Sequence, residues 1–450
     1  MREKRTVQAS IFEGYAEHEI GRELQAMSAW LDTQPELLDW VAADVKQRNV
    51  EETGRKGLSI ESVLRCALLK QYRQLSYEEL VFCLLDSSSC QTFARVAGGW
   101  CPKKATLQNS ISAISAVTWE QINQRLLRSA AEAQKERGEL LRIDSTVTES
   151  PIHAPSDSTL LWDSVRVLVR LLQRAQELVA GVTTIRYRNH QRVAKKRARA
   201  IGYTRGQEQQ RSLYRDLVEV TTKTLGYVEA AGLQLRVALA GEPTAVALWQ
   251  AQVDHYRPLI RQVLEQTQRR VFQGEQVPAA EKIVSIFEAH TDIIVKGQRE
   301  VQYGHKLNLS SGRSGLILDV VIEAGNPADA ERFLPLLERH IAQYGKAPRQ
   351  MAADGGYASV ENLRDAKALA VNDVVFHKKR GLHLEEMAKS PWVYRKLRNF
   401  RAGIEAGISC LKRAYGLGRC TWKGLAHFRA YVWSSVVAYN LALFGRLVST

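Results

Sequence analysis

Apolar residues in the first third of the chain recur at the spacing of amphipathic helices. The clearest run places one helix face at Ile60, Val63, Leu64, Ala67 and Leu68. This i, i+3, i+4 pattern predicts a helix from about Leu58 to Arg73. The segment Ser76-Tyr-Glu-Glu79 then has the form of a capping box, with Leu75 and Leu80 placed as a hydrophobic staple, and predicts a second helix to about Leu85.

Two further capping residues predict two more helices in this region. Thr106 is positioned to cap a helix whose apolar face is Leu107, Ile111 and Ile114. Thr118 is positioned to cap another, ending near Gly138, whose apolar face is Ile122, Leu126 and Ala130. Residues 1–137 are therefore expected to be mostly helical. Short helices joined by turns fit either a helix-turn-helix DNA reader or an all-helical interaction domain, and their spacing does not choose between the two.

Short apolar runs after Glu139 predict buried strands. They lie at Glu139–Asp144, Lys282–Phe287, Lys306–Leu309, Leu316–Ile322, Gln350–Asp354 and Val374–Phe376. Helical spacing returns at about Leu160–Arg270, Ala328–Tyr344, near Val360, at Trp392–Ala414 and at Leu425–Leu447. Strands mixed with helices predict an α/β (α+β) class, and the long helical block after the first strand predicts an insertion into it.

Length and composition fit a globular protein. At roughly 150 residues per domain, 450 residues suggest about three domains. A chain that is 45% hydrophobic and 25% charged is neither disordered nor fibrous. The opening segment has no secretory signal pattern, and the apolar stretch Tyr431–Phe444 is too short to span a bilayer, so a cytoplasmic protein with no membrane partner is expected. Six cysteines without a CxxC pair predict reduced thiols.

Positive charge is concentrated in two segments of the chain. The formal net charge is +15, and residues 186–205 hold eight Lys or Arg and no acid. From Lys378 to the C-terminus, 14 basic residues face three acids. Such segments suit DNA phosphates, although a merely solvated basic helix is the alternative for each of them. The DNA-contacting candidates there are Arg186, Arg188, Arg192, Lys195, Lys196, Arg197 and Arg199.

Three acids are the candidates for chemistry. Asp144 and Asp354 each end a predicted core strand, and Glu405 lies on a late helix, with separations of 210 and 51 residues. If the strands are neighbours, their carboxyl ends bring the two aspartates together, and a helix packed beside them supplies the glutamate. Three carboxylates without Cys or His are hard oxygen ligands that suit two Mg²⁺ or Mn²⁺ ions. Each acid alone has a structural alternative: Asp144 as a turn cap, and Glu405 as an i−4 partner of Arg401.

Helical geometry around Glu405 adds a basic flank. Arg398, Arg401, Glu405 and Lys412 fall within about a 60° arc at the edge of the apolar face. Gly403 and Gly407 lie inside the same helix, where glycine costs about 1 kcal/mol against alanine, so close approach to this backbone is expected. No GxxxxGK[ST], HExxH or GxSxG motif occurs, which argues against NTPases, zincins and α/β-hydrolases. His305 and His377 show no ligand spacing and are interpreted as polar or DNA-facing.

At these residues the chain resembles bacterial insertion-sequence transposases with a DDE catalytic domain, closest to the ISNCY type. The segments that carry the resemblance are residues 57–115, IDSTVTESPIHAPSDSTLLWDSV, YGHKLNL, ADGGY and RNFRAGIEAGISCLKRAYGLGR. The resemblance implies an RNase H-like fold with a mixed five-stranded sheet and flanking helices. It places the metal-binding catalytic triad on Asp144, Asp354 and Glu405. Arg401 and Lys412 fit the family's spacing around the glutamate, but Arg398 stands where the family has tyrosine, and Tyr394 lies one turn earlier.

The resemblance also implies a function and a domain plan. The function is cleavage at the element's ends and joining of the 3′-hydroxyls to target DNA by two-metal phosphoryl transfer, without a nucleotide triphosphate. Partners are the terminal inverted repeats, target DNA and at least a second copy of the chain, and Lys306 joins the DNA-contacting candidates. The expected parts are a helical DNA-binding domain at 1–137, a catalytic core at 138–163 and 276–424, a basic helical insertion at 164–275, and a C-terminal helix at 425–450. Two alternatives stay open: an inactive DNA-binding regulator with this fold, and a purely hydrolytic RNase H-like nuclease.

Overall fold

The structure is a computed structural model that describes residues 15, 17–46, 57–96, 101–241, 243–296, 300–378 and 380–449. The chain forms two compact units. One unit combines Met1–Pro151 with Gly304–Thr450, and the other is Ile152–Tyr303. The opening residues predicted to carry no secretory signal lie largely outside the described part.

A mixed sheet is the centre of the fold. Its strands are β1 (Leu140–Glu149), β2 (Asp292–Lys296), β3 (Glu300–Ser311), β4 (Ile317–Ile322), β5 (Gln350–Ala353) and β6 (Asp373–Phe376). Their order is β2-β3-β1-β5-β6, with β4 also paired to β3. β1 runs antiparallel to β3 and parallel to β5, which in turn is parallel to β6. The predicted RNase H-like class with flanking helices is confirmed, and the sheet has six strands where five were expected, because β2 extends it beyond β3.

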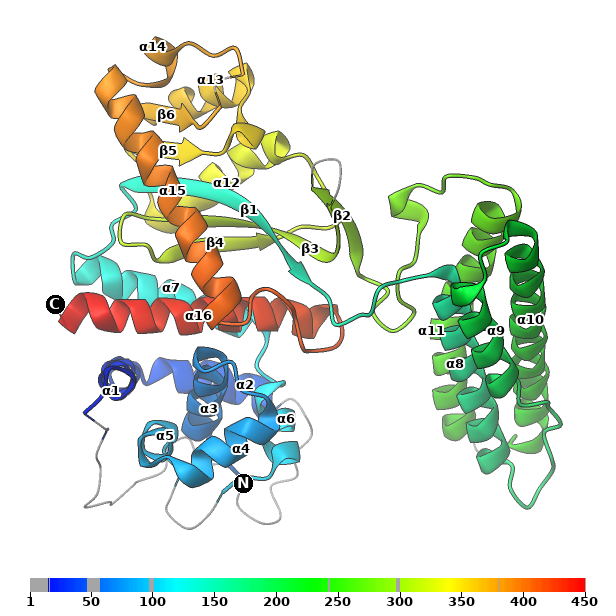
Figure 1. Cartoon of the computed structure of the whole chain (residues 1–450). Coiled ribbons are helices and arrows are strands. Elements are labelled where there is room, and N and C mark those ends of the chain that lie inside the picture. The colour runs from blue at the N-terminus through cyan, green and yellow to red at the C-terminus, as the bar shows by residue number, and fades with distance from the viewer. Residues whose placement is uncertain are drawn as a thin grey trace. The chain divides into compact units, whose positions relative to one another are not determined.

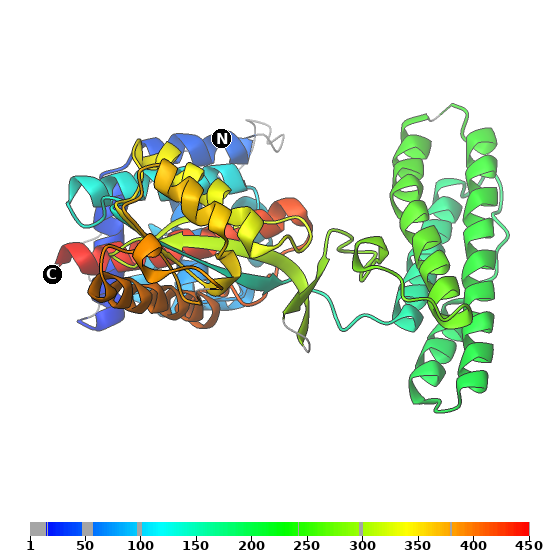
Figure 2. The ribbon, with the colours of Figure 1, turned by 90° about the horizontal axis from the view of Figure 1, so that it is seen from above.

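Helices cover both faces of this sheet. α15 (Pro391–Ala414) crosses β1 and β5 on one face, and α12 (Asp329–Tyr344) and α13 (Val360–Ala368) lie on the other (Figures 1 and 2). Side chains alternate along a strand, so Arg142 and Asp144 point toward α15 while Leu141 and Ile143 are fully buried on the opposite face. Alternate residues of β1 therefore face the polar site under α15 and the apolar core on the opposite side of the sheet.

The described part of residues 19–132 contains seven helices, and three of them pack against the last helix of the chain. The seven are α1 (Glu19–Asp32), α2 (Glu36–Lys46), α3 (Ile60–Tyr72), α4 (Tyr77–Asp86), α5 (Ser88–Ala94), α6 (Lys104–Ile111) and α7 (Ala116–Glu132). α16 (Leu425–Ser449) contacts α1, α3 and α7 (Figure 1). By length and composition alone α16, which is longer than the predicted apolar stretch Tyr431–Phe444, passes for a membrane-crossing helix, but 72% of its most apolar window is buried inside the protein. It is a core helix of this unit.

Of the three helix starts predicted from a capping residue, the one at Ser76 is confirmed and the other two are wrong. Ser76 and Glu79 form the expected capping box, each accepting the other's backbone N–H. Thr106, in contrast, lies inside α6, which begins after Lys103. Thr118 lies inside α7, because its N–H donates to Ser115 Oγ, the actual N-cap, at 3.2 Å. α7 also ends at Glu132, before the expected Gly138.

Two strand predictions are corrected as well. β1 does not end at Asp144 but continues to Glu149, because β3 is long enough to pair with it from Arg142 onward. The segment Lys282–Phe287 forms no strand. The Ile283 N–H donates to the Gln266 side chain at 2.9 Å, and the Phe287 N–H donates to Ser285 Oγ at 3.2 Å, so side chains take the place of a partner strand.

The second unit contains four long helices packed side by side (Figures 1 and 2). They are α8 (Asp157–Leu178), α9 (Gln191–Tyr203), α10 (Gln207–Ala238) and α11 (Pro243–Thr267). The predicted apolar face of α8, which includes Val165, Leu168 and Leu172, is fully buried in the core of this unit. Helical periodicity therefore describes this part of the chain well, and its own core allows it to form a compact body.

Candidate active site

The two aspartates lie at the same edge of the paired strands β1 and β5. The parallel register joins Ile143 to Ala353, so Asp144 and Asp354 are the next residue on each strand. β5 ends there while β1 continues, which leaves Asp354 39% exposed and Asp144 14% exposed. The neighbouring strands that the sequence argument required are present.

Glu405 reaches this place from α15 through a shared partner, the Arg401 guanidinium. Arg401 Nη2 lies 2.9 Å from Asp144 Oδ2 and 3.5 Å from Asp354 Oδ1, and Nη1 lies 2.7 Å from Glu405 Oε1. The i−4 pair between Glu405 and Arg401, an alternative to a catalytic role, is therefore present, but the same guanidinium also holds both aspartates. Residues 210 and 51 positions apart in sequence thus meet around one cation.

The donor set fits a hard divalent cation, although the described side chains are not arranged as a metal site. All three candidate ligands are carboxylates, the oxygen donors that Mg²⁺ and Mn²⁺ prefer. Over the described residues, no group of three His, Cys, Asp or Glu side chains is placed to hold a metal. Arg401, only 8% exposed, supplies the positive charge among the acids. A metal ion bound by the three acids would have to displace its guanidinium.

Burial sets the electrostatics of Asp144. Desolvation raises the pKa of its carboxyl, and the Arg401 guanidinium and the Ser145 N–H, which donates to Oδ1 at 2.8 Å, oppose that rise. The nearby carboxylates of Asp354 and Glu405 push the pKa in the same direction as burial. Negative charge is therefore costly here without a cation, which is the condition under which a site binds one.

The absence of a side chain at Gly403 lets α15 pack closely against β1. Arg142 donates through Nη1 to the Phe400 carbonyl at 2.8 Å and through Nε to Ser311 Oγ at 2.7 Å. A Cβ on Gly403 would lie 1.9 Å from Arg142 Nη1, so the predicted close approach is confirmed at this residue. At Gly407 a Cβ would meet only Tyr439 Oη, at an ordinary 3.7 Å, and the expectation is wrong there.

A hydrogen-bonded layer beneath the aspartates was missed by the sequence argument. Tyr357 is fully buried and donates to Asn308 Oδ1 at 2.6 Å. Asn308 stands opposite Ser145 in the β1–β3 ladder and donates to Glu323 at 2.6 Å. Both residues lie in segments that carry the family resemblance, YGHKLNL and ADGGY, and that was the available signal. Their chain of hydrogen bonds links the segment that follows Asp354 to β3 and to Glu323.

The other predicted residues around the glutamate occupy different environments. Arg398 is exposed, and Lys412 is partly exposed two turns beyond Glu405 on α15. Tyr394 is buried, and its hydroxyl donates to the Phe376 carbonyl at 3.4 Å. Lys306 is buried and pairs with Asp329 at 2.6 Å, so its charge is already neutralised.

His305 and the basic segment can also be placed. His305 is 3% exposed and stacks edge-on against Phe428, which corrects its interpretation as a polar or DNA-facing residue. In the second unit, Arg186 and Arg188 precede α9 and are exposed. On α9 itself the exposed predicted cations are Arg192, Lys195, Lys196 and Arg199, while Arg197 is half-buried and pairs with Asp216 at 3.1 Å.

Comparison with known proteins gives one family match. Residues 291–441, about a third of the chain, match the family described as "Transposase DDE domain". The matched segment contains Asp354, Arg401, Glu405 and Lys412 and begins after Asp144. No curated protein and no solved structure matches the chain.

Proposed function

Because the chain carries a transposase DDE domain, which bears out its resemblance to the insertion-sequence DDE transposases, we propose that it is an active DNA transposase with Asp144, Asp354 and Glu405 as its catalytic acids. The observation that carries the proposal is their convergence on one guanidinium from β1, the end of β5 and α15. Asp144, outside the matched segment, joins the set through the register of β1 with β5.

The proposed reaction consists of two phosphoryl transfers. In the first, water attacks the phosphorus at an element end, the bond from phosphorus to the 3′-oxygen breaks, and the 3′-oxygen takes up a proton. In the second, that 3′-hydroxyl attacks a target phosphodiester and loses its proton, and a target 3′-oxygen leaves and is protonated. One phosphodiester replaces another, so no nucleotide triphosphate is consumed.

The three carboxylates would hold the divalent ions, with Mg²⁺ or Mn²⁺ as the ion suited to their oxygens. Two such ions, when bound, activate the attacking oxygen and stabilise the leaving one. Buried Asp144 fixes one side of the site, whereas Asp354 and Glu405 are exposed enough to reach DNA-bound ions. Arg401, once displaced, remains beside the site as a donor for a phosphate, the role expected of it together with Arg398 and Lys412.

Cations elsewhere support a DNA substrate. The exposed basic residues of α9 and of the segment before it offer a sequence-independent phosphate contact, and Tyr203 at the end of α9 is 88% exposed among them. Synapsis of two element ends implies at least two copies of the chain on DNA.

The test is excision and integration of a marked element carrying the gene's native flanks. Asp144→Asn, Asp354→Asn and Glu405→Gln should each abolish both steps while DNA binding in EDTA is retained. Glu361→Gln, a change of the same kind at an exposed residue of α13, is the matched control and should move the element normally.

Each of the other outcomes points to a different set of catalytic residues or to a different activity. Full movement in one acid variant removes that residue from the triad. Cleaved ends that are never joined identify a hydrolytic nuclease. DNA binding by the wild type without any cleavage identifies a binding-only regulator.

A further inference from the structure

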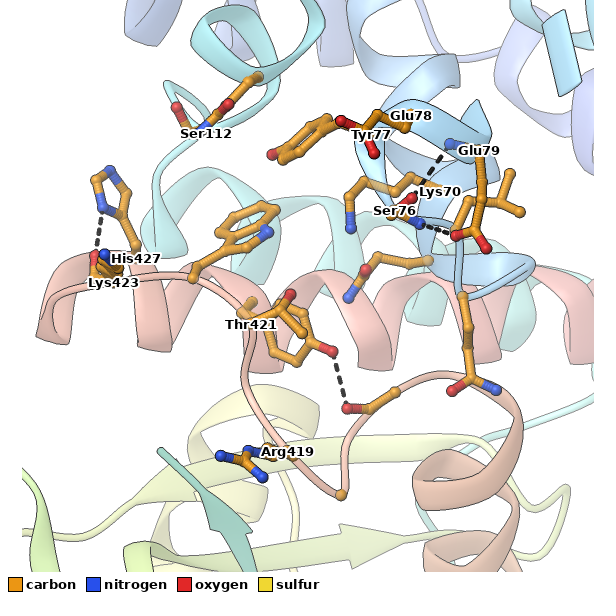
Figure 3. Close-up of a pocket in the computed structure, with 18 of the residues that line it drawn as sticks. Lys70, Ser76, Tyr77, Glu78, Glu79, Ser112, Arg419, Thr421, Lys423 and His427 are labelled. Atoms are coloured by element: carbon orange, nitrogen blue, oxygen red, sulfur yellow. Dashed lines mark hydrogen bonds between the residues drawn. The ribbon is translucent and has the colours of Figure 1, made fainter. Parts of the chain in front are cut away.

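A cavity of about 1140 Å³ lies in the first unit, away from the three acids (Figure 3). Its walls come from α3, α4 and α6 on one side, and from α15 and the loop between α15 and α16 on the other. Figure 3 shows Lys70 and Tyr77 on the first wall, and Arg419, Thr421 and Lys423 on the loop across from them. Lys70 and Tyr77 lie in the N-terminal segment that carries the family resemblance, and Arg419 and Lys423 lie in the basic C-terminal segment, but none of them was singled out as a site residue.

The loop that forms one wall is held in place by several contacts. The Glu149 N–H at the end of β1 donates to the Gly418 carbonyl at 3.0 Å, and the Cys420 N–H donates to the Glu149 carbonyl at 2.8 Å. Thr148 Oγ1 donates to the Leu417 carbonyl at 2.7 Å. The Tyr431 hydroxyl, from α16, donates to the Gly416 carbonyl at 2.9 Å. The wall is therefore preorganised, so a ligand entering the cavity need not order it.

Within the described part of the chain, two donors of the cavity wall, the Lys70 ammonium and the Trp422 indole N–H, form neither a hydrogen bond nor a salt bridge. Lys70 is 5% exposed, and across the described residues no carboxylate forms a salt bridge with it. Its Nζ lies instead 4.9 Å from the Tyr77 ring centroid and 6.0 Å from that of Trp422. The Trp422 indole N–H is buried and has no acceptor among the residues that the structure describes. Burial of an ammonium without an anion is costly, and desolvation accordingly lowers the pKa of Lys70 to about 8.

The acids of the cavity wall are largely engaged elsewhere. Glu78 pairs with Lys104 at 2.5 Å, and Glu79 accepts the Ser76 N–H of the capping box. Counting every Lys, Arg, Asp and Glu of the cavity wall, five cations stand against three acids: Lys70, Lys104, Lys412, Arg419 and Lys423 against Glu78, Glu79 and Glu149. The cavity therefore has an excess of positive charge, two buried donors and aromatic rings, which together suit an anion attached to a flat or apolar group.

We propose that this cavity binds a phosphodiester of the DNA strand that the three acids cleave, with Lys70 and the Trp422 N–H as its buried donors. The proposal rests on the proposed function, since it takes DNA as the ligand. Lys412 connects the two places: it lines the cavity and lies seven residues beyond Glu405 on α15, roughly 10 Å along the helix axis. That distance corresponds to about three base pairs of rise, so one duplex is long enough to reach from Glu405 to the Lys412 side of the cavity. The site anchors DNA between the N-terminal helices and the catalytic sheet.

The test measures affinity for a mixed-sequence DNA duplex in EDTA, over a series of salt concentrations, for the full chain. Lys70→Met should lower the affinity about tenfold at moderate salt and reduce the slope of log K against log[salt] by about one phosphate contact. Trp422→Phe, which keeps a ring and loses the N–H, should lower the affinity severalfold. Lys346→Met, at an exposed lysine between α12 and β5, is the matched control and should have little effect.

Thermal unfolding separates a binding role from a structural one. Lys70→Met should keep or raise the melting temperature, because it removes a buried charge that has no counter-ion in the free protein. The proposal is overturned if wild type binds DNA and both cavity variants bind it equally well. It is also overturned if Lys70→Met and Trp422→Phe lose affinity only in proportion to the fraction of protein that is unfolded. A third contrary result is that inorganic phosphate stabilises wild type but not Lys70→Met, while the two proteins bind DNA with equal affinity. Absence of DNA binding by wild type refutes the proposed function instead.

Discussion

Two buried cations of the same unit have opposite surroundings. Arg401 has three carboxylates around one guanidinium, whereas Lys70 has two aromatic rings and, among the described residues, no salt-bridging acid. Both are less than a tenth exposed. Arg401 neutralises the three acids of the proposed active site. Lys70, which forms no salt bridge with a described acid, has a charge that a negative ligand can neutralise. The difference shows that burial alone does not define a cation's role; the charge of its neighbours does.

The largest expected effect comes from removing the cation that has partners. Arg401→Met leaves Asp144, Asp354 and Glu405 facing one another, with Asp144 largely buried. Unfolding free energy should fall by about 3 kcal/mol, less than for a fully buried group because Asp354 and Glu405 are screened by solvent. Magnesium added without DNA should restore part of the melting temperature of this variant and leave wild type nearly unchanged. Equal magnesium responses in the two proteins would contradict the view that the guanidinium occupies the cation position.

A second change tests how closely α15 packs against β1. Gly403→Ala places a Cβ against Arg142, whose guanidinium is held at both ends, and should cost about 2 kcal/mol of unfolding free energy. Gly407→Ala is the control on the same helix. It meets only Tyr439 at an ordinary distance and should be neutral or stabilising by up to about 1 kcal/mol. Denaturant titration of both variants measures the difference, and equal costs would show that Arg142 moves freely aside.

A third prediction concerns cations that are exposed rather than buried. Changing Arg192, Lys195, Lys196 and Arg199 of α9 together to glutamate should lower DNA affinity at least tenfold and flatten its salt dependence. Stability should change little, since these charges are solvated and have few partners. Metal binding by the first unit should be unaffected. Fluorescence anisotropy at several salt concentrations is the measurement, and an unaltered affinity would identify α9 as a solvated helix.

The smallest effect is a pH dependence confined to Lys70. Its ordinary pKa of 10.5 falls to about 8 in the folded protein, so between those values the unfolded chain binds more protons. Stability should therefore rise with pH across this window in wild type and not in Lys70→Met. DNA affinity should change the opposite way, falling severalfold as pH rises above about 8, because binding then requires proton uptake. Cys420 and Glu79, which lie near the ammonium, favour its charged form and therefore oppose the lowering of its pKa by burial.

Sequence patterns predicted well whatever is decided by neighbours along the chain. The capping box at Ser76, the helices α12, α15 and α16 and the short strand before Asp354 follow from local spacing and were predicted almost to the residue. The predictions were wrong where pairing with a segment far along the chain determines the secondary structure. β1 runs on to Glu149 because β3 is present to pair with it, and Lys282–Phe287 lacks such a partner.

The charged residues divide in the same way. The sequence by itself determined which acids and cations the chain offers, their spacing along α15 and the excess of positive charge. Long-range folding alone brings Asp329 to neutralise Lys306, joins Arg401 to all three acids, and puts Lys70 near two aromatic rings where, among the described residues, it forms no salt bridge. The physical reason is that helical and strand periodicity depend on residues a few positions apart, whereas the free energy of a charge depends on burial and on partners that the fold brings from far along the chain.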